Sequence, residues 1–313
     1  MSYQRGLHEL GDGLYAYLQP DGGWGWSNAG LITGGGASLL VDTLFDLRLT
    51  AEMLAAMAPM LARSPLSAAF NTHGNGDHCF GNQLLPADLP IHATRAAAAA
   101  MRAAPPAAVH RLVTDSSLGP EWLAFAQQRF GSFEFDGIEL REPTTVFDGG
   151  IEVSVGDRVV ELFEVGPAHS EGDAIAYVPD AATVFSGDIL FVGGTPIVWS
   201  GPIANWLAAC DRILALDART IIPGHGPVSG PDGVRIVQGY LAHVREQARM
   251  RFEAGVNADE AADDIDLGEF ADLGDPERIV VNVETLYREF DPARAPVPVP
   301  QLFARMAKWV ARH

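Results

Sequence analysis

The stretch that decides the fold of this chain is Asn71-Thr72-His73-Gly74-Asn75-Gly76-Asp77-His78-Cys79-Phe80-Gly81-Asn82. It follows the apolar residues Ala68-Ala69-Phe70, so a strand is expected to run out into a polar loop, where functional residues usually lie. Glycines in this loop allow turns tight enough for nearby side chains to converge. Imidazole nitrogen and carboxylate oxygen are ligands that Zn²⁺ selects. A polar loop whose histidines only form hydrogen bonds would look the same, so downstream residues must decide between the two readings.

Composition and charge restrict the class of protein. The chain has 313 residues, 48% of them apolar, which is enough for a sizeable core. Forty acidic residues against 21 basic ones give a formal charge of -19, which repels nucleic acid and anionic lipid. We therefore expect a small-molecule substrate, no nucleic acid and no membrane as partners, while a homo-oligomer is compatible with the sequence.

The compartment is expected to be the cytoplasm. The N-terminal residues carry no signal pattern, and no apolar run approaches the ~20 residues that a membrane span needs. The two cysteines, Cys79 and Cys210, lie in different contexts and predict no disulfide framework, as is typical of a reducing compartment.

Apolar periodicity predicts the same order of elements in both halves of the chain. In the first half we expect strands over 14–18, 29–33 and 38–41, a helix over 49–61, and a strand that leads into the His73 loop. In the second half we expect strands over 152–155, 159–165, 174–178 and 183–185, a helix over 205–216, and a strand over 220–222. Each half ends in a loop that carries histidine.

Two helical additions are expected around this core. An Ala-rich segment over about 95–130 reads as an insertion that covers the site. After residue 230 the chain is mainly helical, with helices over 234–253 and 301–310, and the Pro-rich segment 292–300 is expected to separate the last helix from the body. We expect one domain over 1–313, with its core over 10–230 and a C-terminal extension over 231–313.

Three further ligand candidates each follow a predicted strand in a glycine-bearing loop. They are His169 in Gly166-Pro-Ala-His-Ser-Glu-Gly-Asp173, Asp188 in Ser186-Gly-Asp-Ile-Leu190, and His225 in Pro223-Gly-His-Gly226. Together with the His73 loop, this order of motifs resembles the metallo-β-lactamase superfamily. The resemblance covers roughly residues 10–230 and implies an α/β fold, a four-layer αββα sandwich with the metal between two similar halves.

The resemblance also implies two groups of metal ligands. The first group is Asp77, His78 and His225; the second is His73 and His169, with Asp188 bridging the two. Asn75 stands where the family motif His-x-His-x-Asp-His has its second histidine. Because a carboxamide oxygen is a weak ligand for zinc, we expect one tightly held Zn²⁺ in the first group and a weak or empty second site.

Three tryptophans are candidates for binding the substrate. Trp24 and Trp26 are expected to share one face of an extended segment, and the resemblance places such an N-terminal hairpin beside the active site, where they would hold an apolar or aromatic substrate. A tightly packed hairpin explains the same two residues equally well. Trp199 follows the Asp188 loop closely enough to line the same cavity.

The chemistry that follows is hydrolysis. Zinc with an open coordination position lowers the pKa of bound water from 15.7 to about 7, so hydroxide is available at neutral pH. Asp77, Asn75 and Asp188 are the expected catalytic residues: Asp77 as a ligand, Asn75 as a donor to the oxyanion or the leaving group, and Asp188 orienting the hydroxide.

Within the superfamily the sequence resembles two groups of enzymes. One comprises the lactamase-like thioesterases and cyclases of polyketide pathways; the other comprises zinc-dependent hydrolytic dehalogenases of the kind that act on chlorothalonil. We therefore expect hydrolysis of a thioester, ester or polyketide-type intermediate, with dehalogenation of a chlorinated aromatic as the alternative. A non-catalytic metal-binding scaffold is the alternative of a different class.

Overall fold

The N-terminal half of the protein forms a seven-stranded mixed sheet. The structure is a computed structural model and describes residues 3–313. The strand order follows the chain, with β1 to β4 antiparallel and β4 to β7 parallel. The strands are β1 (Gly6–Gly11), β2 (Leu14–Leu18), β3 (Ala29–Gly34), β4 (Ala37–Val41), β5 (Leu66–Phe70), β6 (Ile91–Thr94) and β7 (Thr145–Phe147).

A five-stranded sheet from the second half packs face to face on the first. Its order is β12-β11-β10-β9-β8, and only the β11–β12 pair is parallel. The strands are β8 (Gly150–Val155), β9 (Arg158–Glu164), β10 (Ala174–Val178), β11 (Thr183–Phe191) and β12 (Thr220–His225). Inward side chains of both sheets form one buried apolar layer, to which Ile32 and Phe70 contribute from the first sheet and Leu162 and Phe185 from the second.

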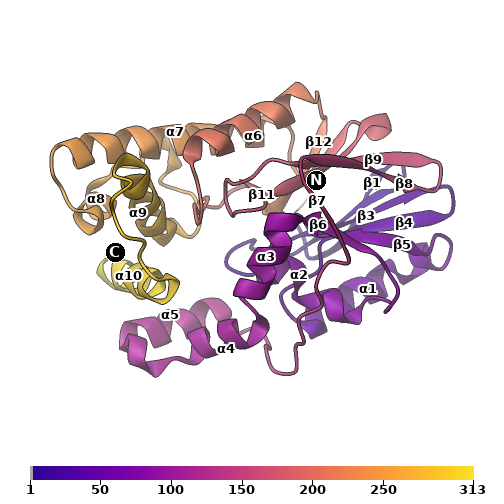
Figure 1. Cartoon of the computed structure of the whole chain (residues 1–313), viewed down its shortest axis with the longest axis horizontal. Coiled ribbons are helices and arrows are strands. Elements are labelled where there is room, and N and C mark those ends of the chain that lie inside the picture. Colours follow the sequence, from indigo (N-terminus) through magenta and orange to yellow (C-terminus); the bar gives the residue numbers. More distant parts are fainter. Residues whose placement is uncertain (1–2) are drawn as a thin grey trace.

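Helices cover the outer faces of both sheets (Figure 1). α1 (Leu47–Leu61) connects the parallel strands β4 and β5 and buries Leu49, Met53 and Met57; its N-terminus is capped by Asp46, which accepts a hydrogen bond from the Leu49 amide. α6 (Ile203–Ala215) makes the equivalent connection between β11 and β12, and α7 (Pro231–Glu253) runs beside it. The predicted αββα sandwich and its two strand-helix-strand halves are confirmed.

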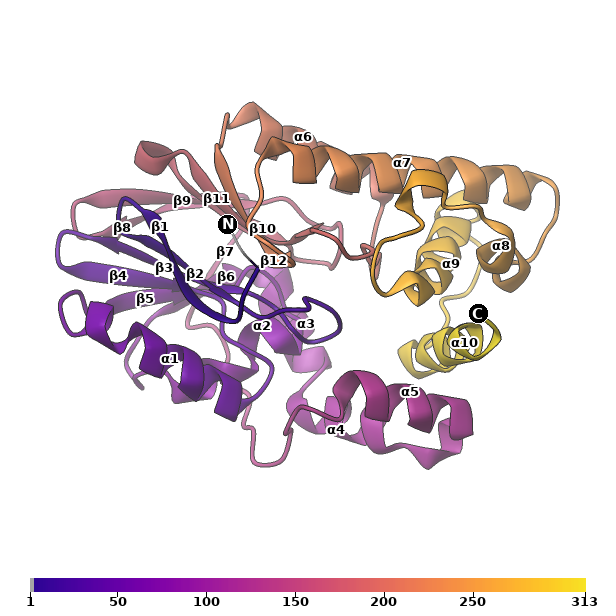
Figure 2. The same ribbon diagram turned by 180° about the vertical axis from the view of Figure 1, so that it is seen from behind.

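The helical insertion and the C-terminal extension lie together at one end of the sandwich, as both ribbon views show (Figures 1 and 2). The insertion contains α3 (Arg95–Ala103), α4 (Pro106–Thr114) and α5 (Pro120–Phe130), and the extension adds α8 (Ala258–Asp264), α9 (Ile279–Phe290) and α10 (Val299–Arg312). The expectation that the Pro-rich segment separates the last helix from the body is wrong. α10 is amphipathic and buries Leu302, Phe303 and Met306, and Phe303 contacts Trp122 of α5 at a ring distance of 5.3 Å.

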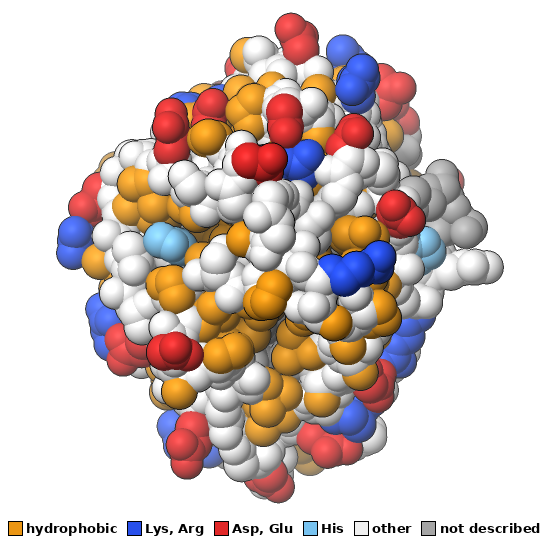
Figure 3. Space-filling view, turned by 90° about the vertical axis from the view of Figure 1, so that its right-hand side faces the viewer, with side chains coloured by type: hydrophobic (Ala, Val, Ile, Leu, Met, Phe, Trp, Pro, Cys, Tyr) orange, Lys and Arg blue, Asp and Glu red, His pale blue; other side chains and the backbone are white. Residues whose placement is uncertain are grey.

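Several short elements were not predicted. β1 and β7 are the edge strands of the first sheet, and β1, β6 and β7 have only three to six residues with weak apolar alternation. A four-residue helix, α2 (Gly76–Cys79), begins inside the His73 loop. Charged side chains of both signs surround the end of the sandwich opposite the appended helices (Figure 3). No helix within residues 3–313 is both long and apolar enough to cross a bilayer.

Candidate metal centre

All six predicted ligands meet at one rim of the sandwich. His73 follows β5, Asp77 and His78 lie on α2, and His169 lies in the loop between β9 and β10. Asp188 lies within β11, and His225 ends β12. Their ligand atoms form two groups, within each of which the atoms lie no more than 4.8 Å apart: His73, His169 and Asp188 in one, Asp77, His78 and His225 in the other.

Backbone carbonyls fix the tautomer of two of these imidazoles. His169 Nδ1 lies 2.8 Å from the Ile197 carbonyl oxygen, and His225 Nδ1 lies 3.1 Å from that of Gly22. A carbonyl can only accept, so each Nδ1 carries the proton and donates. In the neutral imidazole the remaining nitrogen, Nε2, then presents a lone pair toward the cluster, as metal-binding histidines do.

Asp42 fixes the other two imidazoles, one of them through Thr72. His78 Nδ1 donates to Asp42 Oδ2 at 2.9 Å. The Thr72 hydroxyl also donates to Asp42, at 2.8 Å, so its oxygen must accept from His73 Nδ1, which lies 3.0 Å away. All four histidines therefore have Nδ1 as the donor to the surroundings and Nε2 directed at the cluster.

Asp188 occupies the centre of the arrangement. Its Oδ2 lies 3.4 Å from His169 Nε2, 3.5 Å from His225 Nε2 and 3.8 Å from His73 Nε2, and its Oδ1 lies 3.1 Å from His78 Nε2. Gly224, next to His225, packs against this carboxylate so closely that any side chain at that position would overlap it. Asp77 completes the first group, with Oδ2 at 3.3 Å from His225 Nε2.

These side chains fit a cation. His73 Nε2, His78 Nε2 and Asp188 Oδ1 are buried and have no hydrogen-bond partner among the described residues. Neutral imidazole lone pairs facing carboxylate oxygens at 3.1–3.8 Å repel each other unless a proton or a metal ion lies between them. The set of imidazole nitrogens and carboxylate oxygens is the one that zinc selects.

The electrostatics of the first group lead to the same conclusion. Burial lowers the pKa of His78, but Asp188, Asp77 and Asp42 outweigh it and hold that pKa well above its ordinary value. Burial alone would also lower the pKa of His225, but the nearby carboxylates, Asp188 first, outweigh burial and raise that pKa to about 9. Burial raises the pKa of Asp77, yet the imidazoles, His78 first, lower it to about 2. Positive charge therefore stabilises the group of Asp77, His78 and His225, and either bound protons or a divalent cation can supply that charge.

Asn75 lies against the second group. Its Nδ2 is 3.0 Å from His169 Nε2. Because the Ile197 carbonyl fixes the proton of His169 on Nδ1, Nε2 must accept here, and Asn75 must present its amino group rather than its oxygen. The carboxamide thus covers the lone pair that a second metal would need, and its second N–H remains free to donate.

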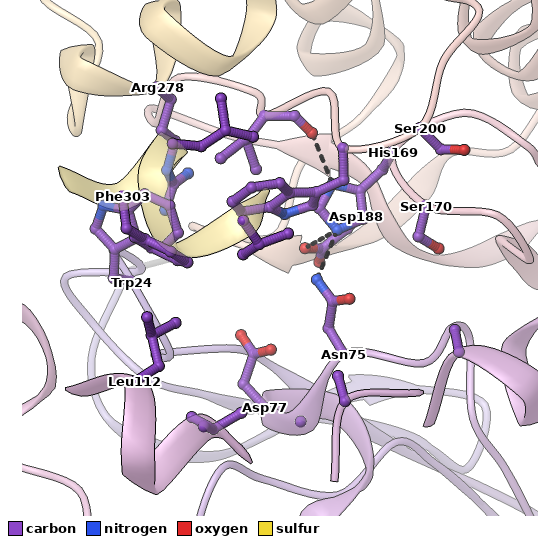
Figure 4. A pocket seen from close by; sticks show the side chains of 18 of the residues that line it. Trp24, Asn75, Asp77, Leu112, His169, Ser170, Asp188, Ser200, Arg278 and Phe303 are labelled. Carbon is purple, nitrogen blue, oxygen red and sulfur yellow. Dashed lines mark hydrogen bonds and ion pairs between the residues drawn. The ribbon is translucent and has the colours of Figure 1, made fainter. Parts of the chain in front are cut away.

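A cavity of about 700 Å³ lies above the ligands. In the close view, Asn75 reaches His169 beside Asp188, and Asp77 lies nearby, with Trp24, Leu112 and Phe303 at one end and Ser170 and Ser200 at the other (Figure 4). Its apolar wall comes mainly from the appended helices and the Pro-rich segment that precedes α10: Val109 and Leu112 of α4, Phe130 of α5, Val297 from that segment, and Leu302 and Phe303 of α10. The two additions therefore build the space in which a substrate would lie.

Comparison with known proteins identifies the family. The family described as "Metallo-beta-lactamase superfamily" matches residues 22–225, about two thirds of the chain. This protein belongs to the metallo-β-lactamase superfamily. The matched segment begins in the loop that carries Trp24 and ends at His225, so it includes every predicted ligand and the insertion but not the C-terminal extension.

The relatives are hydrolases, and this protein is an enzyme of the same superfamily. Acyl-coenzyme A thioesterase MBLAC2 of Bos taurus is 27% identical over 112 residues, which cover 34% of this chain and 39% of that enzyme; the match thus spans about two fifths of that relative. MBLAC2 of Gallus gallus is 25% identical over 227 residues, covering 69% of this chain and 78% of that protein. A solved structure of a double mutant of the sec-alkyl sulfatase PisA1 shares the fold, with a TM-score of 0.67, 17% identity, and coverage of 94% of this chain and 52% of that one.

The three predicted tryptophans do not share one location. Trp24 and Trp199 line the cavity, with ring centroids 6.4 Å apart. Trp26 does not: it packs on Phe133 at 4.8 Å and lies outside the cavity lining. The expectation that Trp24 and Trp26 lie on one face is therefore wrong, because Gly25 has φ +74°, which breaks the extended alternation between them.

Sequence reasoning missed two residues that organise the site. Asp42 holds His78 and, through Thr72, His73; it directly follows β4, and an acidic residue at the end of a buried strand was the available signal. Arg278 lies in the cavity wall although it belongs to the extension, where it directly precedes α9, and no local pattern marks it. Asp173 accepts hydrogen bonds from the amide and hydroxyl of Ser170, so it caps its loop.

Proposed function

We propose that this protein is a zinc-dependent hydrolase of thioesters with an apolar acyl or aryl group. The observation that carries this proposal is the convergence of four Nε2 atoms and two carboxylates at the floor of an apolar cavity. Asp77, His78 and His225 would hold the zinc, because the other group depends on Asp188, which also adjoins His78 and His225, and has His169 Nε2 covered by Asn75. When bound there, zinc supplies a Lewis acid and lowers the pKa of coordinated water to about 7.

Residues of the chain then determine how a substrate is oriented. The apolar walls hold the acyl group, and the carbonyl carbon is directed to the floor beside Asn75 and Asp188, whose side chains both lie against His169 (Figure 4). The second N–H of Asn75 is free to donate to the carbonyl oxygen as negative charge develops on it. Asp188 accepts hydrogen bonds from the attacking water and so orients it.

The cavity favours a leaving group that departs as an anion. Among the described residues that line it there is no lysine, tyrosine or cysteine, and its histidines are ligand candidates. Of its two glutamates, Glu171 accepts a hydrogen bond from Ser200 and Glu284 is paired with Arg294 and Arg305. A thiolate needs little help from a general acid, because a thiol has a pKa of about 8.5; an alkoxide leaving group would need a proton donor. This favours a thioester over an alkyl ester and accords with the activity named for the MBLAC2 relatives.

Dehalogenation of a chlorinated aromatic is the second candidate. Chloride also leaves without a proton, and the aromatic side chains Trp24, Phe130, Trp199 and Phe303 line the cavity with surfaces on which a flat ring can pack. This substrate would meet the same ligands and the same amide donor.

One set of assays tests both candidates. Zinc-loaded protein is given a benzoyl or hexanoyl thioester, the oxygen ester of the same acyl group, and a chlorinated aromatic. We expect the thioester to be cleaved with a kcat/KM at least about 10²-fold above that of the matched alkyl ester, since only the alkoxide needs a general acid. Chloride release without thioester cleavage would establish the second candidate, whereas protein that purifies without stoichiometric zinc and cleaves nothing would indicate a scaffold.

A further inference from the structure

One short segment of the C-terminal extension, residues 274–278, lies close to the metal centre. In the loop that follows β11, the Thr195 amide donates to the Gly274 carbonyl at 2.8 Å, and the Gly274 amide donates to the Gly193 carbonyl at 3.0 Å. The segment therefore lies beside the strand that carries Asp188, although more than 80 residues separate the two in sequence. It lies outside the region that matches the family.

Arg278 is the central side chain of this segment. It is only 2% exposed, its Nη1 donates to the Thr195 carbonyl at 2.8 Å, and its Nη2 pairs with Asp275 at 3.0 Å. Its guanidinium lies over two aromatic rings, 4.5 Å from the centroid of Trp24 and 5.1 Å from that of Phe191. Such desolvated cation–π contacts fix the position of a ring as well as attract it.

Each of those rings belongs to the site. Phe191 stacks on the His225 imidazole, with centroids 5.1 Å apart and planes within 5° of parallel. Trp24 forms the cavity wall, and its indole nitrogen donates to buried Glu277 at 2.8 Å. Arg129 of α5 pairs with Asp275 and Glu277, and Arg278 also pairs with Asp275. The two carboxylates thus balance the charges of the two arginines, so Arg278 needs no anionic substrate as a counter-ion.

We propose that Arg278 is a positioning residue that fixes the His225 imidazole, through Phe191, and the substrate wall, through Trp24. One guanidinium thus couples the appended extension to both the metal and the cavity. The proposal rests on the proposed metal centre but not on the proposed substrate.

Arg278→Met and Arg278→Lys test this role. Arg278→Met keeps a long apolar chain without charge, and Arg278→Lys keeps the charge but not the planar group that contacts both rings. Arg251→Met is the matched control: Arg251 also belongs to the extension and pairs with a carboxylate, Asp264 at 2.8 Å, but it lies outside the cavity lining. The first readout is zinc affinity by competition with a chelator, with no substrate present.

We expect both Arg278 variants to bind zinc about 10-fold more weakly, the lower end of the range for groups that orient metal ligands, and Arg251→Met to bind it as the parent does. The second readout is tryptophan emission of the metal-free protein, which should shift in both Arg278 variants and not in a Trp24→Phe background. Folded Arg278 variants with parental zinc affinity and parental emission would overturn the proposal. A parent protein that binds no zinc would instead refute the proposed metal centre, and the Trp24 emission result would then test the remaining half of the inference.

Discussion

The two ligand groups lie on the same floor but differ in completeness. Asp77, His78 and His225 offer three donors to one point, whereas His73 and His169 share Asp188 with the first group and have Asn75 in place of a further imidazole. The amino group of Asn75 also covers His169 Nε2. In the metal centre that we propose, Asn75 therefore makes the two sites unequal, because it offers a hydrogen-bond donor where the family motif has a ligand.

The largest effect is expected from breaking the complete group. Asp77→Ala, His78→Ala or His225→Ala should reduce bound zinc from about one per chain to below about 0.1 after dialysis, because two protein ligands rarely retain the metal. Turnover should fall in proportion, as measured by metal analysis and assay of the same sample. His243→Ala, which changes a half-buried histidine of α7 that is not among the six predicted ligands, is the control. Retention of zinc and activity in any of the three variants would place the catalytic metal elsewhere.

Asn75→Ala separates a donor from a ligand. The zinc should remain, while kcat should fall about 10²–10³-fold, the usual loss for one oxyanion donor. Ser200→Ala, at the far end of the cavity, should keep the parental kcat. If Asn75→Ala with bound zinc turns over at the parental rate, the carboxamide only fills the vacated histidine position.

The tryptophans adjoin different groups. Trp199 lies against the loop of His169, whose carbonyl accepts its amide hydrogen at 3.0 Å, and Trp24 lies two residues after Gly22, which holds His225. Trp199→Ala should raise KM for an apolar substrate about 10-fold with kcat within about 2-fold, since an apolar wall binds ground and transition states alike. Trp24→Ala should raise KM and also weaken zinc binding. Equal effects of the two variants on zinc affinity would contradict the assignment of each wall to its own group.

Asn75→His should remove the asymmetry. A new imidazole beside His73 and His169 would complete a second set of nitrogen ligands, so the zinc content should rise from about one to about two per chain. Equilibrium dialysis followed by metal analysis measures this. Two firmly held zinc ions in the unmodified protein would show that the second group is complete without a third imidazole.

The smallest effect concerns the helical wall above both groups. Glu284 of α9 is buried and binds Arg294 of the Pro-rich segment and Arg305 of α10, at 2.7–2.9 Å. Burial raises the pKa of Glu284, but the two arginines outweigh this and lower it below 4.5. A carboxyl group whose pKa is lower in the folded protein than in the unfolded chain stabilises the folded state. That stabilisation is complete at a pH above the pKa of the unfolded chain and is lost as the pH falls through the pKa of the folded protein.

Glu284→Gln should therefore reduce the free energy of unfolding by about 1 kcal/mol at pH 7, a value discounted because both arginines are partly exposed. The difference from the parent should shrink as the pH falls below 4.5. Urea unfolding of both proteins across this range measures it. A difference that does not depend on pH would mean that packing, not the ionised carboxylate, holds α10.

Local patterns in the sequence predicted the order of elements in each half and the ligand motifs, and the family resemblance of those motifs implied the sandwich. Strand alternation and helical spacing repeat within each half, and His73 and His169 follow strands in loops, although Asp188 lies within β11 and His225 ends β12. The departure at Asn75 was likewise visible as a single letter in a motif. The insertion was predictable because its alanine-rich helices carry their own periodicity.

Only the tertiary structure decided the surroundings of these ligands. Trp26 points away from Trp24 because of one backbone angle at Gly25, and no periodicity reports a single φ. Asp42, Arg278 and the face of α10 act on residues between 30 and about 280 positions away. Such contacts depend on how separate elements pack in three dimensions, which a one-dimensional pattern does not encode. The sequence therefore determined the candidate ligands. The fold determined their tautomers, the amide orientation of Asn75 and the walls of the cavity.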